Sequence, residues 1–200
     1  MSSRRILAIN GSYRRDGITD QAVDQLLDEA RSRGAAVEHI HLRDHRIEFC
    51  RNCRECMQYP GDAPGECVID DGMAELVEKI ERADAYVLAA PTNFSAVTAL
   101  FKRFMERLAP YGYWPWGAMA PVYRKAKLRQ KPTVIISSCG APGFLGRLTF
   151  GTNQTLKAAT RAIGGNIVGR MFTGLVARER DQELPPRARH KAATLAHKLC

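Results

Sequence analysis

Four of the six cysteines fall within a short stretch of the chain, at Cys50, Cys53, Cys56 and Cys67. Three thiolates separated by two residues each can bind one face of an iron–sulfur cluster, and a more distant fourth thiolate can complete the ligand set. Tetrahedral zinc is an alternative for the same four sulfurs. Unligated thiols or a redox pair are another, since free cysteines pack well as small apolar groups. The spacing indicates a candidate metal site and leaves its occupant open.

A polar loop bounded by glycines follows the first apolar run. Residues 11–17 read Gly-Ser-Tyr-Arg-Arg-Asp-Gly, so the loop carries the Ser12 hydroxyl and the Arg14 and Arg15 guanidinium groups, and Thr19 follows it. The loop opens a helix-like pattern, and the unpaired N–H groups and dipole at a helix start attract anions. The spacing is neither G-x-G-x-x-G nor Gly-Lys-Ser/Thr. It therefore favours a mononucleotide phosphate; the alternative is an ordinary strand–helix turn.

Short apolar runs alternate with helix-like patterns along the chain, and they must position these side chains. The runs predict buried strands at residues 5–10, 36–42, 85–90, 133–138 and 166–174. Helical spacing predicts helices around residues 22–30, 73–80, 97–108, 153–163 and after Pro186. Thr19 or Asp20 is expected to cap the first helix, and Asp70 and Asp71 the second. Five strands joined by helical crossovers predict a doubly wound parallel sheet in a three-layer α/β/α arrangement.

The loops at 11–19, 91–95 and 138–144 all follow predicted strands. In doubly wound sheets, ligands bind at the carboxyl ends of the strands, so we expect these loops to form one site. We find no internal repeat and no linker that marks a second domain. The expectation is a single domain over residues 1–200, with a cysteine-bearing loop at 50–67 and an aromatic and basic insertion at 109–131.

Three segments together resemble the NAD(P)H-dependent FMN reductases, a family of flavodoxin-like proteins. They are residues 10–19 (Asn-Gly-Ser-Tyr-Arg-Arg-Asp-Gly-Ile-Thr), 90–96 (Ala-Pro-Thr-Asn-Phe-Ser-Ala) and 101–107 (Phe-Lys-Arg-Phe-Met-Glu-Arg). The resemblance covers most of residues 4–175 and implies a flavodoxin-like fold with strand order 2-1-3-4-5. The family loop commonly reads Gly-Ser-Pro-Arg and then Gly-Asn-Thr. Tyr13 and Ile18 depart from it, so position 18 keeps only its backbone amide for phosphate.

The resemblance implies three groups of contacts to FMN. Those to its phosphate are Ser12, Arg14, Gly17, Ile18 and Thr19. Those bordering the isoalloxazine are Pro91, Thr92, Asn93 and Phe94. Those lining the remaining side are Ser138, Cys139 and Gly140. A flavin needs a flat apolar slot, amides near its polar ring edge and an anion site for its tail, which agrees with these residue types. For Phe94, packing in the core is an equal alternative.

The cysteine segment looks like that of iron–sulfur flavoproteins, a branch of the same superfamily. In that branch the gap before the fourth cysteine is usually shorter than the one between Cys56 and Cys67. Many flavodoxin-like reductases also carry similar cysteines here without a known cluster. The resemblance thus adds weight to an iron–sulfur cluster and keeps zinc and free thiols as alternatives.

Histidines and aromatic residues supply two further patterns. His39 and His41 share a strand face and, with His45, are candidates for a metal site, but we favour an exposed sheet edge for them. The Tyr- and Trp-rich stretch 111–123 is too aromatic for an ordinary solvent loop. It covers the flavin, contacts a second subunit or forms a satellite core cluster; the sequence leaves these three open.

Charge is placed unevenly along the chain. The net charge is +9, with −3 in residues 1–120 and +12 in residues 121–200. A basic half fits anionic nucleotides, whereas the chain has no RNP-type aromatic motif or zinc-finger spacing, so we expect no nucleic-acid partner. No apolar run is long enough for a bilayer, and the N-terminus has no signal-peptide core, so we expect no membrane partner and a cytoplasmic location.

The function that the resemblance implies is an FMN-dependent oxidoreductase. It would transfer a hydride from NAD(P)H through bound FMN to a small acceptor such as a quinone, a free flavin or a nitro compound, with no side chain required as acid or base. The alternative is an iron–sulfur flavoprotein or flavodoxin-like electron carrier without nicotinamide turnover, although flavodoxin carriers are usually acidic. A non-catalytic basic module for nucleic acid is a third class. The family tends to form homodimers or homotetramers, and we expect one of these.

Overall fold

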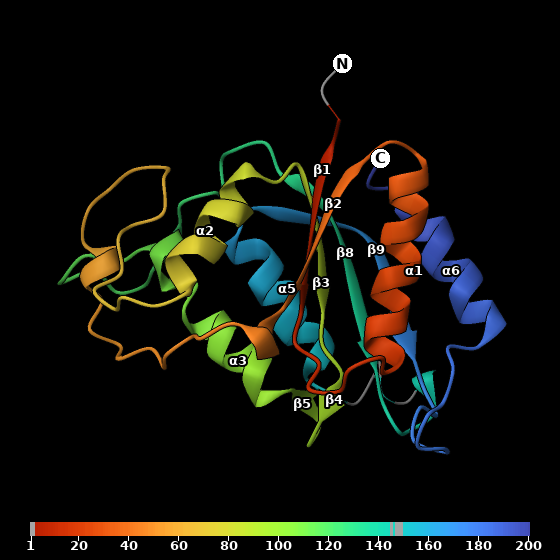
Figure 1. The fold of residues 1–200 in the computed structure, drawn as a ribbon. Coiled ribbons are helices and arrows are strands. Elements are labelled where there is room, and N and C mark those ends of the chain that lie inside the picture. The colour runs from red at the N-terminus through yellow and green to blue at the C-terminus, as the bar shows by residue number, and fades with distance from the viewer. Residues whose placement is uncertain (1–2, 145, 147–149) are drawn as a thin grey trace.

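The computed structural model of the protein describes residues 3–144, 146 and 150–200 (Figure 1). Its central sheet has five parallel strands in the order β2-β1-β3-β8-β9. These are β1 (Arg5–Asn10), β2 (Ala36–His41), β3 (Ala85–Ala89), β8 (Lys131–Ser138) and β9 (Gly165–Thr173). Counted along the chain among themselves, the strands follow the order 2-1-3-4-5. The predicted fold class is confirmed.

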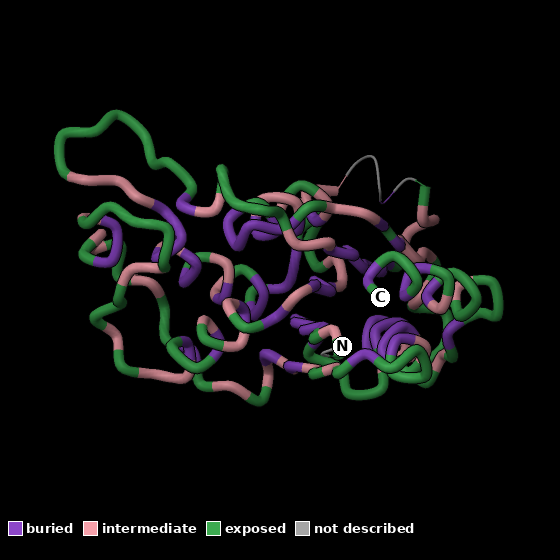
Figure 2. Tube along the Cα trace, turned by 90° about the horizontal axis from the view of Figure 1, so that it is seen from above, coloured by how far each residue is buried: buried purple, intermediate pink, exposed green. Residues whose placement is uncertain are grey.

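Helices cover both faces of the sheet (Figure 1). One face packs against α1 (Ile18–Ser32) and α6 (Pro186–Ala196), and the other against α2 (Met73–Arg82), α3 (Ala99–Glu106) and α5 (Thr152–Ala162). Each face therefore has its own apolar cluster. All five side chains of β3 are buried, as expected for a central parallel strand covered on both sides. Figure 2 shows the buried residues gathered in the middle of the molecule, with exposed loops at its ends.

The predicted helix at 97–108 begins later than expected. Two short antiparallel strands, β4 (Thr92–Asn93) and β5 (Ala96–Val97), form a hairpin directly after β3. Its two turn residues, Phe94 and Ser95, have φ angles of 46° and 63°. α3 then starts after Thr98, whose side chain accepts a hydrogen bond from the amide of Phe101 and caps the helix. The hairpin thus includes Val97, the first residue of the predicted helix, and α3 begins two residues later than predicted.

The side-chain caps predicted for two helices differ from those observed. Gly17 precedes α1 and no side chain caps that helix, so the prediction for Thr19 or Asp20 is wrong; both lie in the first turn and are buried. Gly72 precedes α2. Asp71 does accept a hydrogen bond from the amide of Met73 at 3.0 Å, but its carboxylate also binds the Arg107 guanidinium.

The remaining short elements lie beside the sheet. η1 (Leu42–Asp44) follows β2, and η2 (Glu55–Met57) lies within the cysteine-bearing loop. η3 (Ala109–Tyr111), β6 (Gly112–Tyr113) and β7 (Val122–Tyr123) belong to the aromatic insertion. The cysteine-bearing loop and the insertion project together from one side of the sheet (left in Figure 1). Within the part of the chain that the structure describes, no helix is both long and apolar enough to cross a membrane.

Candidate functional site

A cavity of about 540 Å³ opens at the carboxyl ends of β1, β3 and β8. The predicted site loops meet there because all parallel strands end at the same edge of the sheet. The wall consists of residues 12–19 and 21 from the first loop and α1, residues 91–93 and 98 from the segment after β3, Ser138, and residues 176, 181 and 182 from the segment after β9.

Most of the residues predicted to contact FMN lie in this wall. It contains all five predicted phosphate residues, Ser12, Arg14, Gly17, Ile18 and Thr19. It also contains Pro91, Thr92, Asn93 and Ser138. Three predicted residues are not part of it. Phe94 is fully exposed at the tip of the β4–β5 hairpin, which excludes the core-packing alternative. Cys139 is buried, with its thiol donating to the Ala141 carbonyl, and Gly140 is exposed.

The first loop is held in shape by the polar residue that ends β1. The Asn10 side-chain oxygen accepts a hydrogen bond from the Ser12 amide at 2.9 Å, and its amide nitrogen donates to the Asp20 carboxylate at 2.7 Å. The Ser12 hydroxyl donates to the Arg14 carbonyl at 3.1 Å. Asn10 and Asp20 are buried, so these bonds are shielded from water. These bonds therefore hold the loop in its conformation.

The start of α1 presents free backbone donors to the cavity. The first N–H groups of a helix have no partner within the helix, and no side chain caps this one at Gly17. Arg14 and Arg15 add positive charge at the exposed rim, where Arg14 donates to the Arg180 carbonyl and Arg15 pairs with Asp44 at 2.7 Å. Donors, helix dipole and guanidinium groups together make this end of the cavity attractive to an anion.

Hydroxyl groups tie the three loops to one another. The Thr19 and Ser138 hydroxyls are 2.9 Å apart and join α1 to the end of β8. The Thr98 hydroxyl donates to the Gly11 carbonyl at 2.6 Å and joins α3 to the first loop. A Cβ at Gly11 would lie 2.6 Å from the Cβ of Phe101, so this close approach requires glycine. The cavity walls thus keep a fixed spacing.

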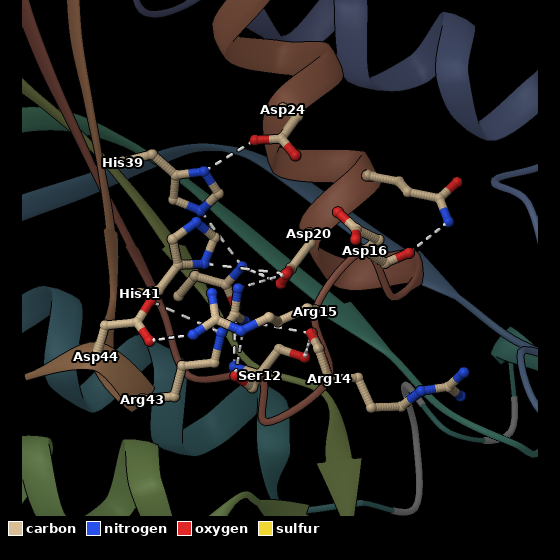
Figure 3. Close-up of polar contacts among 12 residues, drawn as sticks. Ser12, Arg14, Arg15, Asp16, Asp20, Asp24, His39, His41, Arg43 and Asp44 are labelled. Carbon is tan, nitrogen blue, oxygen red and sulfur yellow. Dashed lines mark hydrogen bonds and ion pairs between the residues drawn. The ribbon is translucent and has the colours of Figure 1, made fainter. Parts of the chain in front are cut away.

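Arg43 is a site-supporting residue that the sequence prediction missed (Figure 3). It lies in η1, just after β2, and its guanidinium donates to the carbonyls of Ser12 and Arg14 at 3.1 and 3.2 Å. It also pairs with the Asp20 carboxylate at 3.0 Å. The available signal was its position after a strand, at the carboxyl edge of the sheet. The sequence prediction placed the ligand site only in the loops after three of the five strands, and the loop after β2, which contains Arg43, was not among them.

The segment after β9 closes another side of the cavity and was also missed. The Gln21 side chain donates to the carbonyls of Asp16 and Gln182 at 2.8 and 3.1 Å and accepts from the Leu184 amide at 2.7 Å. A glutamine on α1 thereby connects the first loop to a segment far along the sequence. No local sequence pattern predicts a contact between Gln21 and this distant segment.

The two strand histidines lie at the sheet edge but are half-buried rather than exposed. The ring centroids of His39 and His41 are 3.9 Å apart, and His39 pairs with Asp24 at 2.9 Å. Burial, followed by the charges of His39 and Arg43, lowers the pKa of His41. Among the described residues, no group of three or more His, Cys, Asp or Glu side chains is arranged to hold a metal ion.

The four clustered cysteines line a second, much smaller cavity of about 20 Å³. Cys56 is buried, Cys50 and Cys53 are half-buried, and Cys67 is exposed. Burial raises the pKa of Cys56 to about 11, and the nearby thiols of Cys67, Cys53 and Cys50 add to the shift. The buried Arg107 guanidinium donates to the Cys67 sulfur at 3.5 Å. The sequence cluster is thus also a cluster in space.

The aromatic insertion packs on the cysteine-bearing loop. The Arg54 guanidinium carbon lies 3.8 Å from the ring centroid of Trp114 and 4.4 Å from that of Trp116. The Trp114 amide donates to the Met57 carbonyl at 2.9 Å, and the Arg124 side chain donates to the Cys56 carbonyl at 3.3 Å. No insertion residue belongs to the described wall of the larger cavity. These contacts are those expected of a satellite cluster, one of the three alternatives for stretch 111–123, and the contact with a second subunit stays a prediction.

Comparison with known proteins identifies the family. Residues 4–170 match the family model described as NADPH-dependent FMN reductase. The chain belongs to this family. An iron–sulfur flavoprotein of Archaeoglobus fulgidus is 37% identical over 111 residues, which cover 56% of this chain and 48% of the relative. The match thus spans about half the length of this curated relative.

Solved structures of other flavoproteins share the fold of this FMN reductase family member. An NAD(P)H:quinone oxidoreductase from Methanothermobacter marburgensis superposes with a TM-score of 0.66 at 16% identity, over 98% of this chain and 93% of that one. A flavodoxin from the domain Archaea superposes with a TM-score of 0.54 at 10% identity, over 98% and 95% of the two chains. At these identities the likeness establishes the flavodoxin-like architecture alone.

Proposed function

We propose that the larger cavity binds FMN. The observation that carries the proposal is the uncapped start of α1, which opens into a cavity of about 540 Å³ at the carboxyl edge of the sheet. Its backbone donors and rim arginines suit the phosphate, whose proposed contacts are Ser12, Arg14, Gly17, Ile18 and Thr19. Family membership supports the choice of a flavin over another nucleotide.

The flavin ring is assigned to the cavity walls formed after β3 and β8. Pro91, Thr92 and Asn93 would border the isoalloxazine, with the exposed Phe94 ring beside the opening. Ser138 would lie on the opposite side, and Cys139 and Gly140 follow it outside the described wall. The Thr19–Ser138 and Thr98–Gly11 hydrogen bonds hold these walls in register, so the ring would enter a preformed slot.

The proposed activity is transfer of a hydride from NAD(P)H to a small acceptor such as a quinone, a free flavin or a nitro compound. Bound FMN would supply the redox chemistry, and the chain would bind and orient it and its substrates. The family name and the NAD(P)H:quinone oxidoreductase neighbour support this reaction class. No side chain is required as acid or base. A homodimer or homotetramer without nucleic-acid or membrane partners completes the proposal.

The test begins with the purified chain in the absence of air. Titration with FMN should quench flavin fluorescence to saturation. After free FMN is removed, the complex should oxidise about one equivalent of NADH or NADPH per bound FMN by itself, and many equivalents only when a quinone or nitro acceptor is added. Thr19→Val, which removes a proposed phosphate contact, should weaken FMN binding about tenfold. Thr194→Val on α6, remote from the cavity, is the matched control. If the folded wild-type chain does not bind FMN, the proposal is wrong; flavin binding without nicotinamide oxidation supports the carrier alternative.

A second candidate function is that of an iron–sulfur flavoprotein. It is favoured because Cys50, Cys53, Cys56 and Cys67 converge on one cavity and because curated relatives carry that name. A cluster would add one-electron transfer. It holds its thiolates around a core of several atoms and so spaces them more widely than a single ion does.

Iron and acid-labile sulfide measured on anaerobically prepared protein test the cluster. Both should be present in the wild type and lost in Cys56→Ser, while Cys200→Ser, which changes an exposed cysteine outside the group, should retain both. Zinc in place of iron and sulfide would identify the tetrahedral alternative. A metal-free chain after anaerobic reconstitution with iron and sulfide would leave the cysteines as free thiols.

A further inference from the structure

Arg43 binds the backbone of the first loop (Figure 3). It is absent from the described cavity wall, yet its guanidinium contacts two carbonyls of the loop, those of Ser12 and Arg14. Its side chain is only 11% exposed. The contacts of Arg43 are with the loop backbone and with Asp20, not with the described cavity wall side chains. Arg43 acts on the backbone that lines the cavity.

The contacts of Arg43 match the requirement of an anion-binding loop. Such a loop turns N–H groups toward the anion, so carbonyl oxygens on its other side need donors. Arginine has a planar fork of donors that can serve several acceptors at once, whereas lysine is a single point of charge. By binding the carbonyls on both sides of Tyr13, Arg43 fixes the orientation of the peptide groups between them.

A closed circuit of three hydrogen bonds and one ion pair supports the loop. The Ser12 amide donates to Asn10, Asn10 donates to Asp20, the Asp20 carboxylate forms an ion pair with Arg43, and Arg43 donates back to the Ser12 carbonyl. The Asp20 side chain is 3% exposed, so its ion pair with Arg43 is shielded from solvent. Both backbone polar groups of Ser12 are thereby engaged, one by the buried Asn10 and the other by the half-buried Arg43. Ser12 itself remains in the cavity wall.

We propose that Arg43 is a positioning residue for the 5′-phosphate and that it sets the preference of this cavity for FMN over riboflavin. The proposal rests on the proposed FMN site. Without the Arg43 fork, the Ser12–Arg14 carbonyls lose donors, and the loop samples orientations in which its amides no longer converge. The phosphate loses affinity, while the ring walls after β3 and β8, which Arg43 does not touch, keep theirs.

The experiment compares two ligands in three variants. Dissociation constants for FMN and riboflavin are measured by fluorescence quenching for the wild type, Arg43→Met, Arg43→Lys and the control Arg46→Met, whose side chain is 84% exposed. Arg43→Met should weaken FMN binding on the order of 10- to 100-fold and change riboflavin binding less than about threefold. Arg43→Lys should fall between, since one ammonium cannot serve three acceptors in the same geometry. Arg46→Met should match the wild type.

The outcomes separate this inference from the proposed function. If wild-type protein binds neither flavin, the FMN site is wrong and the inference falls with it. If it binds FMN but Arg43→Met weakens both flavins equally, or neither, Arg43 has only a structural role or none. Thermal unfolding checks each variant. Should Arg43→Met fail to fold, the FMN-to-riboflavin ratio of Arg43→Lys decides: an unchanged ratio overturns the inference.

Discussion

The buried ion pair of Arg107 and Asp71 joins segments distant in sequence. The two side chains are 1% and 0% exposed, and two hydrogen bonds of 2.5 and 3.0 Å connect them. Arg107 also donates to the Glu48 carbonyl and the Cys67 sulfur. Four segments thus depend on one guanidinium, and none of these contacts follows from the periodicity of the sequence.

Removal of one partner should destabilise the protein strongly. Asp71→Asn leaves the Arg107 charge buried without its counterion, so we expect the free energy of unfolding to fall by about 3–5 kcal/mol. Equilibrium urea unfolding monitored by circular dichroism measures it. Glu78→Gln is the control, because it breaks the exposed Arg82–Glu78 pair and should change stability by less than about 0.5 kcal/mol. Equal effects of the two substitutions would contradict this assignment.

The β4–β5 turn is strained at two residues. Phe94 and Ser95 both have positive φ angles, which side-chain-bearing residues adopt at a cost that glycine avoids. Ser95→Gly should therefore raise the free energy of unfolding by about 0.5–1 kcal/mol. Ala96→Gly, placed one residue later in β5, should lower it by a similar amount. Thermal unfolding of both variants checks the pair, and a loss of stability in Ser95→Gly would contradict the strain.

Among the elements, those with strong apolar patterns were predicted well. β1 and β3 are short apolar runs buried on both faces, and α1 has a regular apolar stripe, so length and spacing alone identify them. The β4–β5 hairpin was missed because its two-residue strands are too short for any periodic signal. The hairpin depends on tertiary hydrogen bonds and on positive φ angles at its turn. Intrinsic residue propensities disfavour such angles, so they give no indication of the hairpin.

The candidate site divides in the same way. The rule that ligands bind at the carboxyl edge identified the loops after β1, β3 and β8, and the cavity lies there. Arg43 and Gln21 were missed because each contacts backbone carbonyls of another segment, and a carbonyl carries no residue identity. A side chain that binds the backbone of a distant segment therefore produces no recognisable spacing of residue types along the sequence.

The cysteine-bearing loop depends on the aromatic insertion. Arg54 stacks between two tryptophan rings and donates to the carbonyls of Trp114 and Pro115 at 2.7 and 3.2 Å. Arg54→Ala should speed amide hydrogen exchange within residues 50–67 by about tenfold or more, because it removes stacking and two hydrogen bonds. Exchange in α1 should be unchanged. Arg51→Ala, at an exposed neighbour, is the control; the same acceleration there would contradict the role of the stack.

For the molecule as a whole, the ion pair at Asp71 should shape the dependence of stability on pH. Burial by itself would raise the pKa of Asp71, but hydrogen bonds from Arg107 and from the Glu48 and Met73 amides outweigh it and hold the pKa below its ordinary value. A carboxyl group with a depressed pKa stabilises the fold fully above its unfolded pKa of about 4 and loses that contribution as the pH falls through its folded value.

Acid should therefore destabilise the wild type more steeply than Asp71→Asn. We expect the urea midpoint of the wild type to fall between about pH 5 and pH 2, and that of Asp71→Asn to fall less over the same interval. Asp84, whose pKa is also depressed, remains in both proteins and contributes equally. Parallel curves for the two proteins would show that Asp71 does not carry the effect.

The Thr19–Ser138 pair has one more property. Two hydroxyl groups 2.9 Å apart contain two protons but need only one between them, and either oxygen can be the donor. The spare proton can point into the cavity from one residue or the other, depending on which rotamer the pair adopts. When both hydroxyl groups rotate about their C–O bonds, the wall can thus present either a hydrogen or a lone pair at the same place, while the backbone stays still. A ligand that gains or loses a proton during turnover would find a hydrogen-bond donor for one protonation state and an acceptor for the other.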